Sequence, residues 1–177
     1  MVKRFLKFFA FLAFFVLALI FFAPKIGMYY FLEQELKVYD AIISGETLQD
    51  KGLHLEIKDA QIFVKSIESA TIKTCDVTLL LFYNTINASE ITLSQSAKSF
   101  VPLKIERLQI SYTILNPLRI NVHVIGEFGS AQANVHILER TLHVELQPSQ
   151  IMSKEYKNAL KEFAKSEDGG FTYDKTF

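Results

Sequence analysis

The sequence has few of the residues that carry covalent or metal chemistry. Its 177 residues include one cysteine, Cys75, which excludes an intrachain disulfide framework and any CxxC metal or redox motif. A glycine-rich phosphate loop, a nucleophile elbow, an HExxH motif and an EF-hand pattern are all absent from it. We therefore expect a protein that is not an enzyme and that needs no cofactor.

The chain also lacks an excess of positive charge. It has 19 basic and 19 acidic residues, and no acidic residue precedes Glu33. Four basic residues do precede it (Lys3, Arg4, Lys7 and Lys25), so the rest of the chain holds 15 basic against 19 acidic residues. A nucleic-acid-binding surface normally has the opposite balance, so we expect no direct contact with nucleic acid.

Hydrophobic residues make up half of the chain and are concentrated at its start. Nine of the sixteen phenylalanines fall within the first 31 residues. Residues 5–24 contain one charge, Lys7, and match the length of about 20 residues that a membrane-spanning helix needs. This pattern predicts a membrane anchor, whose apolar residues include Phe8, Phe11, Phe15, Leu19 and Phe22.

A cleavable signal peptide is the alternative interpretation, because basic residues precede the apolar run. Cleavage is disfavoured because Ala23 is followed by Pro24, and the position two before Ala23 is Phe21 rather than a small residue. The positive-inside rule then places the N-terminus in the cytoplasm. For a bacterial chain this predicts a single-pass inner-membrane protein, in contact with inner-membrane lipids, whose remaining residues lie in the periplasm.

A second helical pattern follows the apolar run. Tyr29, Leu32, Leu36 and Tyr39 recur at helical spacing, with charged residues between them. We expect the helix to continue outward for a few turns, as a stalk, a docking helix or a spacer. Residues 1–40 are thus predicted to be the signal anchor and a juxtamembrane helix.

From Gly52 onward the hydrophobic period is two, which is typical of half-buried strands. The clearest stretch runs from Leu118 to Leu146, where three successive alternating segments are separated by short connections. Such a series predicts an antiparallel meander. We therefore assign residues 41–148 to a curved antiparallel β domain, which makes the chain mainly β.

One face of the predicted sheet is apolar and must be covered by something. The sheet curling on itself, a bound acyl chain and a C-terminal helix are the three candidates. The candidate partner or lipid face consists of Ile120, Val122, Val124, Val135, Ile137 and Val144. Residues 149–177 are predicted to form a helix capped by Ser149, with Met152, Tyr156, Leu160 and Phe163 on one side, and a loose tail from Phe171.

The polar face carries three histidines. If Glu139 and Arg140 form the tip of a hairpin, Ile137 lies opposite Leu142 and His136 lies opposite His143. His123 is on the same face of the preceding strand, so the three form a candidate metal site or pH sensor, against the alternative of plain solvated histidines. Cys75 is in phase with the apolar residues of its segment and is predicted to point inward.

The segment from Ile110 to Leu118 reads ISYTILNPL, a strand with an aromatic residue that runs into an N-P turn. It resembles the N-protein family of type II secretion systems. The wider layout resembles AsmA-like and LPS-transport bitopic proteins, in which an N-terminal anchor carries a curved periplasmic β-sheet with an apolar concave face. This resemblance implies a non-enzymatic accessory part of an envelope-spanning secretion, pilus or DNA-uptake machine, with protein partners in that complex.

Three functions are therefore compatible with the sequence. The first is an assembly protein of an envelope machine, which contacts partners through a sheet edge or the juxtamembrane helix. The second is a lipid-binding or lipid-transfer module with an apolar groove, and it requires that the apolar face stay open. The third is a periplasmic enzyme or a metal-dependent sensor built on His123, His136 and His143.

Overall fold

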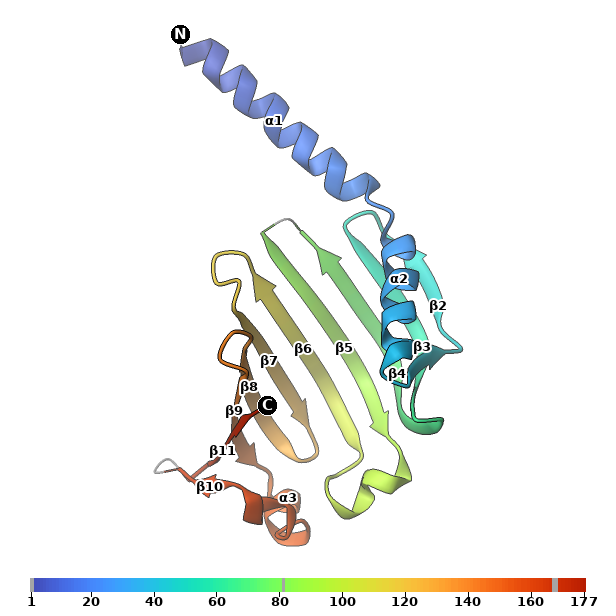
Figure 1. Ribbon diagram of the computed structural model, residues 1–177, viewed down its shortest axis with the longest axis vertical. Coiled ribbons are helices and arrows are strands. Elements are labelled where there is room, and N and C mark those ends of the chain that lie inside the picture. Colours follow the sequence, from blue (N-terminus) through green and yellow to red (C-terminus); the bar gives the residue numbers. More distant parts are fainter. Residues whose placement is uncertain (1, 81, 167–168) are drawn as a thin grey trace.

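The computed structural model describes residues 2–80, 82–166 and 169–177 (Figure 1). Its helices are α1 (Val2–Phe22), α2 (Lys25–Val38) and α3 (Gln150–Glu155), with short 3-10 helices η1 (Gln95–Ser99) and η2 (Ala159–Glu162). The strands are β1 (Ala41–Ser44), β2 (Thr47–Asp50), β3 (His54–Val64), β4 (Ile67–Leu79), β5 (Tyr83–Leu93), β6 (Lys104–Thr113), β7 (Arg119–Gly126), β8 (Gly129–His136), β9 (Thr141–Pro148), β10 (Ala164–Lys165) and β11 (Phe171–Thr176).

These strands form one open antiparallel sheet, in agreement with the mainly β class that the sequence predicts. The order is β1-β3-β4-β5-β6-β7-β8-β9-β11-β10, and β2 also pairs with β3. Strands β3 to β9 follow each other in chain order, so the predicted meander is confirmed and extends over seven strands. Strands β1 and β2 lie within a segment whose glycines and aspartates break the helical pattern in the sequence.

Helix α1 is long and apolar enough to cross a membrane. Its stretch Lys3–Phe22 has a mean hydropathy of 2.7, and none of it is buried against the rest of the chain. The helix ends before Pro24, where a new helix begins, so the anchor and α2 are two helices rather than the single continuous one expected. Figure 1 shows α1 projecting away from one end of the sheet, while α2 lies along it.

Lys25 joins helix α1 to the sheet. Its side chain is 1% exposed, and Nζ donates hydrogen bonds to the main-chain oxygens of Ile20, Phe21 and Ala23 at 3.1–3.3 Å. The same ammonium lies 3.6 Å from the Asp50 carboxylate at the end of β2. A cation at the C-terminus of α1 satisfies carbonyl groups that have no partner within the helix and offsets the negative end of its dipole.

The alternation of side chains divides the sheet into an apolar and a polar face. Two complete apolar rows cross the eight strands from β3 to β11. One is Leu55, Val77, Ile86, Ile110, Val122, Ala133, Val144 and Tyr173, and the other is Ile57, Cys75, Ala88, Leu108, Val124, Ala131, Leu146 and Phe171. A polar row beside them, on the other face, runs Glu56, Asp76, Asn87, Gln109, His123, Gln132, Glu145 and Thr172.

A line of bulges crosses the first half of the sheet. In each strand from β3 to β6 two inward residues are three positions apart instead of two: Ile57 and Ala60, Ile72 and Cys75, Ala88 and Ile91, Ile105 and Leu108. Each strand therefore presents two consecutive residues on the polar face. The line ends at β7, where the pairing with β6 shifts beside Ile105. This explains why the alternation breaks at Asp59 although β3 continues.

Two segments cover parts of the apolar face. Tyr29 of α2 is buried in a core with Leu55, Ile57 and Ala60 of β3, so this helix packs on the sheet and is not a free stalk. At the other side, Met152 and Leu160 are buried in a second core around Phe128 and Leu146. The expected C-terminal contacts are thus present.

The C-terminal helix itself is shorter than predicted. The Ser149 hydroxyl accepts a hydrogen bond from the Met152 amide at 3.1 Å, which confirms the cap, but α3 ends at Glu155 and a 3-10 turn follows. The tail predicted to be loose is the strand β11, paired with β9 over six residues. The tail forms a strand because the outer edge of β9 would otherwise leave main-chain groups without hydrogen-bond partners. Phe171 and Tyr173 of this strand also extend the apolar face of the sheet.

Candidate functional site

An apolar groove lies between α2 and the sheet. It has a volume of about 410 Å³ and is bounded by the helix on one side and strands β3 to β6 on the other. Its walls are Lys25, Met28, Tyr29, Leu32, Ile43, Leu55, Ile57, Cys75, Val77, Leu79, Asn84, Thr85, Ile86, Ile110 and Tyr112. Pockets of this size are typical of sites for small apolar ligands.

The groove opens onto a part of the apolar face that neither α2 nor the C-terminal segment covers. Ile110 and Tyr112 form its far wall, and their cross-strand neighbours on β7 are Val122 and Ile120. Beyond them the same rows continue through half-buried residues of β8 and β9: Ala133, Val135, Leu142 and Val144. The apolar surface thus extends from the groove across four more strands to β11.

Most of the predicted face residues lie on this surface. Ile120, Val122, Val135 and Val144 belong to its rows, whereas Val124 packs against the second core, in the part that the C-terminal segment covers. Ile137 does not belong to its rows, because β8 ends at His136 and Ile137 is 45% exposed in the turn that follows. Sequence reasoning also missed Met28 and Leu32 of α2 as groove residues, although their helical spacing on one side of α2 was a usable signal.

Two titratable groups of the groove wall, Tyr29 and Cys75, have a raised pKa. The Tyr29 hydroxyl is buried and, within the described residues, has no hydrogen-bond partner. Burial, with the neighbouring carboxylate of Glu46, raises the pKa of Tyr29 well above its usual value. Cys75 is buried as predicted, and burial raises the pKa of its thiol to about 11. Neither group is poised for proton transfer or nucleophilic attack near neutral pH.

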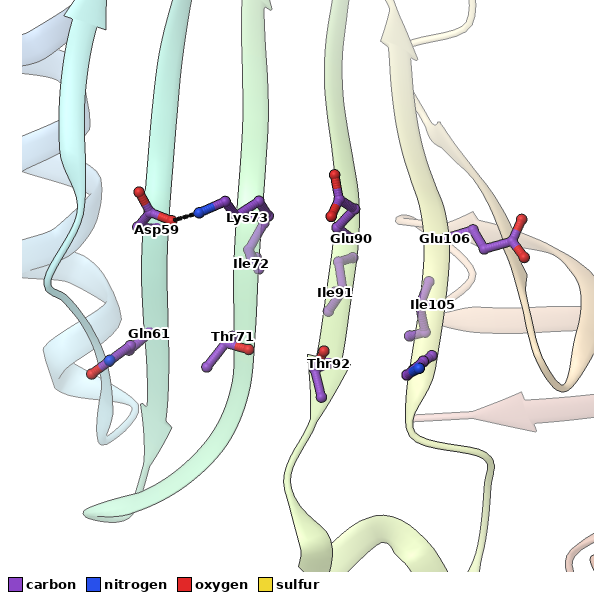
Figure 2. A pocket seen from close by; sticks show the side chains of 11 residues that line it. Asp59, Gln61, Thr71, Ile72, Lys73, Glu90, Ile91, Thr92, Ile105 and Glu106 are labelled. Atoms are coloured by element: carbon purple, nitrogen blue, oxygen red, sulfur yellow. Dashed lines mark hydrogen bonds and ion pairs between the residues drawn. The ribbon is translucent and has the colours of Figure 1, made fainter.

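A second hollow, of about 520 Å³, lies over the bulge line on the polar face (Figure 2). Figure 2 shows Asp59, Lys73, Glu90 and Glu106 side by side on successive strands, and Lys73 forms an ion pair with Asp59. The hollow is open to solvent, and its charges do not converge on one point: Lys73 pairs with Asp59, and the next two strands carry the carboxylates Glu90 and Glu106. We attribute it to the bend that the bulges produce.

The three histidines share the polar face but do not align. His143 pairs with Asn134, His136 pairs with Thr141, and His123 pairs with Gln132. The predicted pairing of His136 with His143 is therefore wrong. The turn between β8 and β9 uses four residues, 137–140, where the prediction assumed a two-residue tip, and this displaces the register by two residues.

Acidic side chains lie beside two of these histidines, His143 and His136. The His143 ring lies 2.6 Å from Asp174 and 3.3 Å from Glu145, whereas His136 is 3.9 Å from Glu139. The hydrogen bonds with Asp174 and then Glu145 raise the pKa of His143. Among the described residues no group of three His, Cys, Asp or Glu side chains is arranged to hold a metal ion.

Comparisons with protein families, curated proteins and solved structures found no match to this chain. The resemblance to secretion and LPS-transport proteins therefore stays a hypothesis that rests on the segment from Ile110 to Leu118 and on the layout. In the structure this segment is the end of β6, a turn and the approach to β7, with Tyr112 on the apolar face.

Proposed function

We propose that the protein is a single-pass bacterial inner-membrane protein whose periplasmic sheet holds the acyl chains of lipids. The observation that carries this proposal is the apolar surface that continues from the groove beside α2 across β6 to β9 without a covering segment. Soluble domains seldom leave contiguous apolar surface of this extent in water, and where they do it usually binds a ligand, a partner or a membrane.

The junction between α1 and α2 supports a permanently retained anchor. Lys25 is buried among the last carbonyl groups of α1, and the Phe21 ring lies against Gly52 in the turn before β3. Removal of the helix after Ala23 would strip Lys25 of its three main-chain acceptors. The anchor therefore acts as a structural part of the sheet domain as well as a membrane tether.

The chemistry of the groove favours an acyl chain over a polar ligand. The surface of its walls is almost entirely carbon, with side chains such as Leu55, Ile86 and Ile110. Burial of one methylene contributes about 0.8 kcal/mol, so an acyl chain with ten buried methylenes gains about 8 kcal/mol before ordering costs. A lipid supplies this apolar area, and its headgroup stays in water.

The test is photo-crosslinking in a membrane. The full chain is reconstituted into phospholipid vesicles that contain a phospholipid with a photoreactive group in its acyl chain, and labelled peptides are mapped by mass spectrometry. We expect labels on β6, β7 and β9 at Ile110, Val122 and Val144, in addition to labels on α1. Labels confined to α1 would overturn the proposal.

A matched pair of variants makes the test specific. Val122→Glu places a carboxylate in the middle of the apolar surface, where an acyl chain would have to desolvate it. Gln132→Glu adds the same charge to the polar face of the adjacent strand, where the side chain is exposed. We expect severalfold less sheet labelling in Val122→Glu and no change in Gln132→Glu, with circular dichroism as the check on folding.

A role in an envelope complex is the second candidate, and the outer edge of β11 favours it. β10 pairs with Phe171 and Thr172 only, and in the described chain no strand covers the outer side of residues 173–176. Such an edge accepts a partner strand. A photo-crosslinker at Lys175 should capture a neighbouring membrane protein in cells, whereas one at Lys154 on α3 should not; equal capture at both positions would refute edge pairing.

A further inference from the structure

The hairpin tips at one end of the sheet carry exposed apolar side chains. In the turn between β4 and β5, Phe82 is 61% exposed. Leu115, between β6 and β7, is 89% exposed, and Leu138, between β8 and β9, is 73% exposed. Leu53, in the turn before β3, is also half exposed. Large apolar residues at the tips of four turns are unusual in water, because tips tend to be polar.

These tips form one continuous rim. The Ile114 amide and the Thr113 hydroxyl both donate hydrogen bonds to the Phe82 main-chain oxygen, at 3.2 and 3.1 Å. The Ile137 amide donates to the Leu118 main-chain oxygen at 2.9 Å. These hydrogen bonds therefore join the turn between β4 and β5 to the turn between β6 and β7. They also join the turn between β6 and β7 to the turn between β8 and β9.

The rim begins at the membrane anchor. The turn before β3 lies against α1, because a side chain at Gly52 would meet the Phe21 ring. The ion pair between Lys25 and Asp50 holds the same corner. Figure 1 shows the turns after β4 and β6 at the end of the sheet from which α1 departs, with the helix slanting above them. When α1 spans a bilayer, the rim is thus the part of the sheet nearest to it.

The opposite end of the sheet has a different composition. Its turns contain Lys65 and Ser66 between β3 and β4, the polar η1 (Gln95–Ser99) between β5 and β6, and Glu127 between β7 and β8. Phe128 in the last of these turns is buried in the core near α3. Exposed apolar residues occur there too, such as Phe100 and the cross-strand pair Val64 and Ile67, but they flank polar turn tips, whereas at the rim the tips themselves are apolar.

We propose that this rim, formed by Leu53, Phe82, Leu115, Leu118, Ile137 and Leu138, inserts into the interfacial layer of the bilayer that α1 spans. Aromatic and aliphatic side chains at turn tips gain free energy there by leaving water, while the polar main chain of the turn stays at headgroup level. The partner is a lipid surface, and the sheet is held against it at two places, the anchor and the rim.

Insertion of the rim brings the apolar face of the sheet to the acyl chains. The row of residues nearest to the rim on that face is apolar except at β5: Leu79, Asn84, Tyr112, Ile120, Val135 and Leu142. Three of these also line the groove beside α2, namely Leu79, Asn84 and Tyr112. An acyl chain can then pass from the bilayer to the face without crossing water. The inference rests on the anchor of the proposed function, but not on acyl-chain binding by the face.

Because the chain has no tryptophan, the fluorescence of a single introduced tryptophan reports on one position only. Single variants Leu115→Trp on the rim, Phe100→Trp at the opposite end and Phe15→Trp in α1 are reconstituted as full chains into phosphatidylcholine vesicles with brominated acyl chains. We expect blue-shifted emission and a drop in intensity of at least about twofold for Leu115→Trp and Phe15→Trp, because bromine quenches indole at interfacial depth. Phe100→Trp should emit as in water. Both sheet positions are exposed, so neither substitution disturbs packing.

The outcomes separate this inference from the proposed function. An unquenched Leu115→Trp beside a quenched Phe15→Trp would overturn rim insertion and leave the anchor in place. Equal quenching of Leu115→Trp and Phe100→Trp would also overturn it, because the contact would not be specific to the rim. An unquenched Phe15→Trp would instead refute the anchor. Acyl-chain labels confined to α1, with Leu115→Trp still quenched, would refute lipid binding by the sheet face and leave rim insertion in place.

Discussion

Replacement of Lys25 by methionine tests how the apolar helix α1 is fixed to the sheet. Methionine keeps the length and much of the volume of the lysine side chain but removes the ammonium. In the native protein this group has four partners: the main-chain oxygens of Ile20, Phe21 and Ala23, and the Asp50 carboxylate. All four lose their partner in Lys25→Met.

The expected cost follows from these contacts. Removal of one partner from a buried ion pair costs about 3–5 kcal/mol when the other charge stays buried. Asp50 is 33% exposed here, and the three carbonyl groups are only partly buried, so water can replace some of the lost hydrogen bonds. We therefore expect the free energy of unfolding to fall by about 2–3 kcal/mol, a large part of the 5–15 kcal/mol typical of a domain.

The measurement is denaturant unfolding of the full chain in detergent micelles, together with hydrogen exchange of the α1–α2 junction. Lys37→Met is the matched control on α2, because Lys37 is 53% exposed and pairs with Glu33 on the surface. Such a pair contributes about 0–1 kcal/mol. Equal stability of Lys25→Met and Lys37→Met, or a more stable Lys25→Met, would refute the view that Lys25 locks the anchor to the sheet.

Three further predictions concern the sheet. The hydrogen bond with Asp174 raises the pKa of His143, so the stabilisation is complete below the ordinary histidine pKa of 6.5 and is lost as the pH rises through the folded-state pKa. The unfolding free energy should thus fall toward alkaline pH, less so in His143→Gln; equal slopes would contradict this. With a pKa of about 11, Cys75 is about a thousandth thiolate at pH 8, so an alkylating reagent should modify it only after unfolding; rapid labelling of the folded chain would show an accessible thiol. Gly129 has a φ of 117° and its Cβ would meet the main chain of β9, so Gly129→Ala should cost at least about 2 kcal/mol in a thermal melt. Gly169→Ala, with a φ of 79° and open space around it, should cost less, and similar costs would implicate backbone strain alone.

Local patterns in the sequence predicted the elements but not their pairing. The period of two in residues 118–146 identified β7, β8 and β9, because alternation reports directly which side chains leave water. The register of β8 with β9 depends on how many residues the turn uses. Nothing local distinguishes a tip of two residues from one of four, and so the alignment of His136 with His143 was predicted wrongly.

The bulge line shows the same limit for the polar face. Asp59 reads as a break in its own segment, whereas in the sheet it is one of four bulged positions that line up across β3 to β6. Each bulge is tolerated because its neighbour carries the same extra residue, so the ladders stay in register on both sides. The alignment involves one position on each of four strands, so a local window of about ten residues cannot detect it.

The apolar anchor, the sheet and its two faces were determined by the sequence itself, since each depends on the local order of polar and apolar side chains. The covering of the apolar face was decided only by the tertiary structure. Whether α2 and the C-terminal residues close that face depends on where Pro24 turns the chain and on where α3 ends, and these two events leave the middle of the face open. The alignment of the apolar turns beside α1 likewise arises from strand pairing, which brings residues from four separate tips to one end of the sheet.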